Sequence, residues 1–174
     1  MIRTASEHLV RAPLLDVERA LLAPETLDGL AAALPEVASA EEVERRDRGA
    51  ALFRSARYVA RVTPPGFRRL LSGDHLEWVE EVTWDRARHA GRFRILPNLK
   101  PERARLFRCG GRYRLEAAAG GTRRVVETEI EIAVRIVGPT VERLVARQLE
   151  PHMAREAEVL ERVARRGAEV VSER

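Results

Sequence analysis

Residues 104–136 read ARLFRCGGRYRLEAAAGGTRRVVETEIEIAVRI and decide the fold prediction, because they hold the clearest strand pattern of the chain. Apolar or small residues alternate with charged ones on both sides of Gly120-Gly121, a pair suited to a tight hairpin turn. The pattern predicts two antiparallel strands, over about 104–117 and 123–136. A turn centred on the two glycines predicts these inward pairs: Leu115 with Val126, Tyr113 with Thr128, Gly111 with Ile130, Cys109 with Ile132, and Phe107 with Val134.

The outward face of the same hairpin carries charged residues. The predicted register places Arg114 opposite Glu127 and Arg112 opposite Glu129. Opposite charges that face each other across a sheet contribute about 0.2–1 kcal/mol per pair. One register therefore satisfies both faces of the hairpin.

Further strands are predicted upstream of this hairpin. Leu76, Trp78, Val82 and Trp84 share one face of a strand that follows Gly73-Asp74, and a shorter strand follows around Phe93. Residues 37–62 predict two more strands around the turn signal at 47–49, and residues 2–10 a first one. The breakers between strands predict loops at 63–74 and 97–103, and loops of this length often cover binding sites.

Helices are predicted at both ends of the chain. Leucines recur at helical spacing on both sides of Pro24, which predicts two short helices between Pro13 and Pro35. A long last helix is predicted to begin after Gly138-Pro139-Thr140 and to run to about Arg166. Pro151 lies inside it and predicts a kink.

Composition limits the class of protein. With 174 residues and 45% apolar residues, we expect one domain, residues 1–168, with a flexible tail at 169–174. The longest uncharged run, residues 29–35, is far shorter than the roughly 20 residues of a membrane-spanning helix. Glu7 interrupts the apolar run that a secretory signal needs, so a cytoplasmic protein is expected.

Cys109 is the only cysteine, which excludes an internal disulfide.

The order of these elements resembles the START-like superfamily, which includes polyketide cyclases and lipid-transfer domains. The resemblance rests on Gly121-Thr122 before a long strand and on residues 136–142, which lead into the last helix. At the other end it rests on Ala12, Pro13, Val17, Leu21, Leu22, Pro24, Glu25 and Leu27. More narrowly, the run from Pro65-Gly66-Phe67 through Trp84 to the last helix looks like a START-like family of high-GC bacteria.

The resemblance implies an α+β helix-grip fold, in which a curved antiparallel sheet of about six to seven strands wraps around the last helix. It also implies a cavity between sheet and helix that takes an apolar small molecule or lipid. The strand and helix faces then suggest the cavity residues Trp78, Glu80, Val82, Phe93, Tyr113, Ile130, Ile132, Leu149, His152 and Met153. Glu80 shares a face with apolar residues, and we expect it to meet Arg54 in a buried pair. That pair could bind a ligand or serve the fold alone.

His152 and Glu156 are four residues apart near the centre of the apolar face of the last helix, so they can contact each other. As a functional pair they would anchor a polar ligand group or act as a general acid and base. As a structural pair they would satisfy each other at the helix edge. The pattern leaves both interpretations open.

Residues 85–114 carry ten basic and two acidic side chains, which raises the possibility of an anionic partner such as nucleic acid. No nucleic-acid partner is expected, because Glu127 and Glu129 are predicted to neutralise part of this positive charge. Exposed aromatic residues for base stacking are also missing.

His8 and His89 stand alone in the pattern, so no metal site is expected. Cys109 is expected to face inward, and no cofactor is implied.

Three functional hypotheses follow. The first is a non-enzymatic carrier or sensor whose cavity, closed by the last helix and the loops 63–74 and 97–103, binds an apolar small molecule or lipid. The second is a cyclase or dehydratase of the polyketide type, with His152 and Glu156 as acid and base. The third is a basic surface module for nucleic acid.

Overall fold

The computed structural model describes residues 1–63, 67–133 and 138–172, and within them a sheet, four α-helices and one short 3₁₀ turn. The strands are β1 (Ile2–Val10), β2 (Val37–Asp47), β3 (Ala51–Ala60), β4 (Glu77–Asp85), β5 (Ala90–Pro97), β6 (Phe107–Ala118) and β7 (Gly121–Ile132). The helices are α1 (Leu14–Leu22), α2 (Pro24–Ala33), α3 (Pro101–Ala104) and α4 (Gly138–Ser172), with the 3₁₀ turn η1 at Phe67–Leu70.

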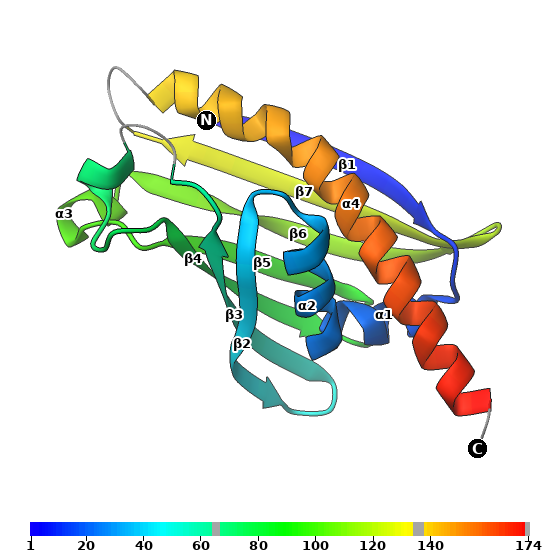
Figure 1. The fold of residues 1–174 in the computed structure, drawn as a ribbon. Helices are drawn as coiled ribbons and strands as arrows, with labels where there is room; N and C mark the ends of the chain where they lie inside the picture. Colours follow the sequence, from blue (N-terminus) through cyan, green and yellow to red (C-terminus); the bar gives the residue numbers. More distant parts are fainter. Residues whose placement is uncertain (64–66, 134–137, 173–174) are drawn as a thin grey trace.

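All seven strands form one antiparallel sheet in the order β1-β7-β6-β5-β4-β3-β2. Figure 1 shows α4 lying diagonally across one face of this curved sheet, with α1 and α2 on the same side. Helix α4 packs against β1, β7, α1 and α2. The predicted helix-grip fold, with two short helices after the first strand, is therefore confirmed.

Prolines separate the two short helices as predicted. Pro24 occupies the first turn of α2, where its missing N–H leaves no bond unmade. Thr26 then donates a hydrogen bond from Oγ1 to the Ala20 carbonyl over 2.5 Å, which joins the end of α1 to the start of α2. Leu27 and Leu30 on α2 and Leu34 just after it are buried against the first residues of β2 and Val159 of α4.

The sheet has a concave face toward the helices and a convex face away from them, because successive side chains of a strand point to opposite sides. Trp84, Val82, Phe93 and Tyr113 are buried on the concave face in one core with Leu160 of α4. Charged residues such as Arg92, Arg112 and Glu127 occupy many of the convex positions, as the alternation predicts. The close fit of this core is visible at Gly91, where an added Cβ would lie 2.6 Å from the Trp84 ring.

The predicted register of the β6–β7 hairpin is wrong by two residues. Tyr113 pairs with Val126 and Cys109 with Ile130, while Ala118 pairs with Gly121 and the turn consists of residues 119–120. A shift of two residues keeps each side chain on the same face of the sheet, so the apolar residues still face inward as predicted. The predicted charge pairs do not: Arg112 faces Glu127, and Arg114 lies beside Glu116, with 2.6 Å between Nε and Oε1. The predicted partner of Phe107, Val134, lies outside the described residues.

Helix α4 runs from Gly138 to Ser172 and contains Pro151. It extends beyond the predicted end at Arg166 and includes residues 169–172, which the sequence assigned to a tail. Met153, Ala157, Leu160 and Ala164 form its buried stripe toward the sheet. The predicted spacing of apolar residues at three and four positions is therefore the one that packs on the sheet.

Candidate functional site

The concave face has a closed half in which side chains are packed away from solvent. Leu52, Trp84, Tyr113 and Val126 form one row across β3, β4, β6 and β7, and each is at most 4% exposed. Leu160 of α4 is fully buried against this row. We refer to these five residues as the closed half. They build the core and leave little room for a ligand.

The other end of the concave face, the open half, is only partly covered. It consists of Trp78, Ile95, Cys109 and Ile132 on the sheet and Leu149 on α4, all partly exposed. Ile95 lies between Glu80 and Cys109 in one cross-strand row. Ligand sites in proteins are concave and mostly apolar, and the open half has both properties.

Residues 67–74 and 97–103, from the two predicted loops, lie together at the end of the sheet next to the open half, while residues 64–66 lie outside the described residues. Ser72 donates a backbone hydrogen bond to the Asn98 carbonyl, and Lys100 donates one to the Leu70 carbonyl, over 2.8 and 2.9 Å. Asn98 also bonds to both neighbours of Leu76, accepting from the Glu77 N–H and donating to the His75 carbonyl. The loops therefore form one connected rim around residues 67–77 and 97–104, which is visible beside α3 in Figure 1.

A buried polar cluster separates the two halves. The guanidinium of Arg54 lies 3.2 Å from Glu80 and donates a second bond to the Leu21 carbonyl at 2.9 Å. Tyr113 donates its hydroxyl proton to the other oxygen of Glu80 over 3.1 Å. The predicted meeting of Glu80 and Arg54 is thus observed. Burial raises the pKa of Glu80 above its usual value, although the Arg54 charge opposes this.

A second buried ion pair lies on the closed side of the same tyrosine. Arg124 of β7 is 0% exposed and contacts Glu156 of α4 over 2.5 Å. Its guanidinium carbon lies 5.3 Å from the centroid of the Tyr113 ring. Burial raises the pKa of Tyr113 well above its usual value, so this phenol stays protonated at neutral pH. Glu156 therefore fixes α4 to the sheet through Arg124.

Both buried arginines keep one unused donor. The Nε atoms of Arg54 and Arg124 have no hydrogen-bond partner in the described part of the chain, and neither has the indole nitrogen of Trp84. Buried donors of this kind are usually satisfied in proteins, either by protein groups or by water. One of these unused donors therefore belongs to the guanidinium that pairs with Glu80.

The predicted contact between His152 and Glu156 is corrected by the structure. His152 places Nδ1 2.8 Å from Glu36, which precedes β2, while Glu156 is occupied by Arg124. Burial lowers the pKa of His152, but the hydrogen bond to Glu36 and nearby carboxylate charges outweigh it and raise that pKa overall. His152 thus lies at the edge of the site, with a side chain 27% exposed.

The other residues predicted for the cavity lie on the helix-facing side of the sheet or on α4. Tyr113 and Glu80 belong to the polar cluster, while Val82, Phe93, Ile130 and Met153 are buried and Trp78, Ile132 and Leu149 are partly exposed. Trp78 is stacked on Tyr58, with ring centroids 5.4 Å apart. Cys109 lies on the concave face as predicted, and burial together with the Glu80 charge raises the pKa of its thiol to about 12.

Two histidines that the pattern left alone have partners. His89 Nδ1 lies 2.6 Å from Glu18 of α1, and His8 lies 3.3 Å from Glu150 of α4. No group of three or more potential metal ligands occurs in residues 1–63, 67–133 and 138–172. The sequence reasoning also missed Arg124. Its position two residues from Val126 on a strand with an apolar face was the signal that could have placed it inside.

Comparison with known proteins identifies the family. A family described as "Protein of unknown function (DUF2505)" matches residues 6–163. The chain belongs to the DUF2505 family. No curated protein matches this DUF2505 chain by sequence.

Solved structures share the fold of this DUF2505 protein. TTHA0849 from Thermus thermophilus is 26% identical with a TM-score of 0.66, and the match covers 95% of this chain and 99% of that one. The Zhui aromatase/cyclase from Streptomyces sp. R1128 is 16% identical with a TM-score of 0.65, covering 95% and 94%. A START superfamily protein from Mycobacterium smegmatis is 15% identical with a TM-score of 0.59, covering 94% and 97%. The DUF2505 chain therefore has the START-like fold.

Within its described residues, the DUF2505 chain has no helix with the length and apolar character to cross a membrane.

Proposed function

We propose that this protein binds an apolar small molecule or lipid with one polar group in the open half of the concave face. One observation carries the proposal: an apolar surface that solvent reaches adjoins a buried polar cluster with an unused donor on Arg54. Ligand sites combine these two features, since apolar side chains supply contact area and a few polar groups fix orientation. The START-like fold of the chain supports the same conclusion.

In this proposal the apolar body of the ligand lies against Trp78, Ile95 and Leu149. Its polar group reaches the Arg54–Glu80 pair. Arg54 supplies an N–H donor there, and Glu80 supplies an acceptor or, when protonated, a donor. A hydroxyl or carbonyl oxygen meets these requirements. The rim made by residues 67–77 and 97–104 is where the ligand passes.

The alternative is an enzyme of the cyclase or dehydratase type that uses the same cavity. The observation that favours it is the Tyr113–Glu80 hydrogen bond, because a carboxyl group of raised pKa beside a protonated phenol is suited to proton transfer. The Zhui aromatase/cyclase shares the fold, and only the fold. Turnover of a model poly-β-keto substrate that is lost in Glu80→Gln would favour this interpretation, and loss in His152→Ala would assign the chemistry to the His152–Glu36 pair instead.

The binding proposal is tested with N-phenyl-1-naphthylamine, an uncharged probe whose fluorescence rises in apolar surroundings. Ile95→Glu puts a charge in the open half, whereas Leu96→Glu puts the same charge on the convex face one residue away. We expect the wild type and Leu96→Glu to bind the probe equally, and Ile95→Glu to bind it at least tenfold more weakly, the cost of desolvating a carboxylate.

Equal binding by both variants would contradict the proposal, because the probe would then occupy another surface. Circular dichroism and the urea midpoint establish that each variant is folded. If Ile95→Glu does not fold, Trp78→Ala serves as the second variant, since it removes contact area at the partly exposed edge of the face.

A further inference from the structure

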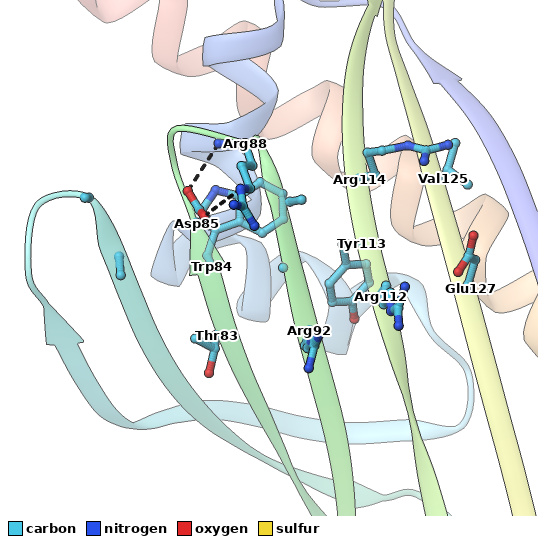
Figure 2. A pocket seen from close by; sticks show the side chains of 14 residues that line it. Thr83, Trp84, Asp85, Arg88, Arg92, Arg112, Tyr113, Arg114, Val125 and Glu127 are labelled. Atoms are coloured by element: carbon cyan, nitrogen blue, oxygen red, sulfur yellow. Dashed lines mark hydrogen bonds and ion pairs between the residues drawn. The ribbon is translucent and has the colours of Figure 1, made fainter.

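The convex face carries a groove that the interior site does not use. Two hollows lie there, of about 600 and 890 Å³, and both are lined by Arg92, Arg112 and Glu127. We call the first of them the convex groove; its other convex-side residues include Ala51, Asp85, Ala90 and Val125. Figure 2 shows Arg92 and Arg112 projecting from neighbouring strands, with Asp85 and Glu127 on opposite sides of them.

Arg92 and Arg112 are an unusual pair, because they lie directly opposite each other on β5 and β6. Like charges in that arrangement repel and weaken a sheet. Both side chains are exposed, and neither has a carboxylate within ion-pair distance among the described residues. Glu127 is the cross-strand neighbour of Arg112 but does not form an ion pair with it.

The surrounding arginines differ in this respect. Arg94, two residues from Arg92 on the same face, lies 2.6 Å from Glu81. Arg114, two residues from Arg112, lies 2.6 Å from Glu116. Arg88 lies 3.7 Å from Asp85 at the edge of the groove. Among the arginines around this groove, the two guanidinium groups in the centre are thus the ones available for an external anion.

The rest of the groove restricts the kind of anion. Ala51, Ala90 and Val125 give it small apolar walls, which favour a compact apolar body next to the charged group. The carboxylates of Asp85 and Glu127 at its sides repel a second negative charge. A nucleic acid or a polyacidic peptide therefore fits less well than a molecule with one anionic group.

We propose that the convex groove binds a monocarboxylate with a compact apolar body, held between Arg92 and Arg112. A planar carboxylate suits guanidinium groups because each can offer it two parallel N–H donors. Binding also removes the repulsion between the two arginines. The site is separate from the interior one, since these side chains point away from the helices.

The test uses 4-fluorobenzoate as the probe and follows its ¹⁹F resonance during titration with the whole protein. We expect binding by the wild type, and at least tenfold weaker binding by Arg92→Gln and Arg112→Gln, which lose a charge-assisted hydrogen bond. Arg94→Gln is the matched control on the same strand and face, and its binding should change less than twofold. Both groove variants should fold as well as the wild type, because each removes a like-charge contact.

Four results would overturn the proposal. The first is no binding up to ~10 mM, and the second is binding unchanged in Arg92→Gln and Arg112→Gln. The others are equal binding of uncharged 4-fluorobenzamide, and displacement of the probe by inorganic phosphate at lower concentration than by unlabelled benzoate. Ile95→Glu separates the two sites: binding lost in that variant but kept in Arg92→Gln would place the probe in the interior instead.

Discussion

The closed and open halves of the concave face are built from the same strands, yet they are covered to different extents. In the closed half, Trp84 and Leu160 have no exposed surface, and α1 completes the packing. In the open half, the concave residues are partly exposed beside a rim of hydrogen-bonded loops. The difference shows that the tightly packed core lies in the closed half, while the open half keeps apolar surface exposed to solvent.

Each half also borders one buried ion pair, and the largest predicted effect concerns the closed one. Glu156→Gln leaves the fully buried Arg124 without its carboxylate, which should cost about 3–5 kcal/mol of unfolding free energy in urea denaturation. Glu80→Gln should cost less, because Arg54 keeps its bond to the Leu21 carbonyl. The double variant Arg124→Met with Glu156→Leu should recover most of the loss. An equal cost for Glu156→Gln and Glu80→Gln would remove the distinction between the halves.

The same substitution, Leu→Ala, can be made in each half of the concave face on helix α4. Leu160→Ala opens a cavity in the closed half and should lower the unfolding free energy by about 2–4 kcal/mol. Leu149→Ala alters a partly exposed position and should cost about 1 kcal/mol. Thermal and urea unfolding of the two variants measure this difference. If Leu149→Ala were as destabilising as Leu160→Ala, the open half would be ordinary core.

The smallest predicted effect is a pH dependence at the edge of the open half. The pKa of folded His152 is raised, so its pair with Glu36 stabilises the protein fully below the ordinary histidine value of about 6.5 and less as pH rises through the raised value. His152→Gln should therefore be less stable than the wild type at pH 6 by about 0.5 kcal/mol, with the gap closing toward high pH. His75→Gln, at an exposed site, is the control. A gap that widens with pH would contradict this assignment.

Sequence alone predicted the parts of this architecture that depend on local pattern. Alternation placed Trp78, Glu80 and Tyr113 on the helix-facing side of the sheet, and two prolines bounded the short helices. The same alternation is blind to a shift of two residues, which is why the β6–β7 register and the partners of Arg112 and Arg114 were wrong.

The polar partners of the site depend on distant segments, which no local pattern contains. Helical spacing correctly brought His152 and Glu156 to one side of α4. It could not show that Glu36 and Arg124, 116 and 32 residues away, would occupy them instead. Arg54 and Glu80 were matched because both interrupt apolar faces of neighbouring strands, a signal that Arg124 also carried.

Native mass spectrometry of the protein, purified without heating, tests the open half most directly. We predict an added mass on the wild type and on Leu96→Glu that is absent from Ile95→Glu, because only the last variant places a charge among the apolar residues of the site. An added mass retained equally by Ile95→Glu would contradict the assignment of the ligand to this half of the concave face.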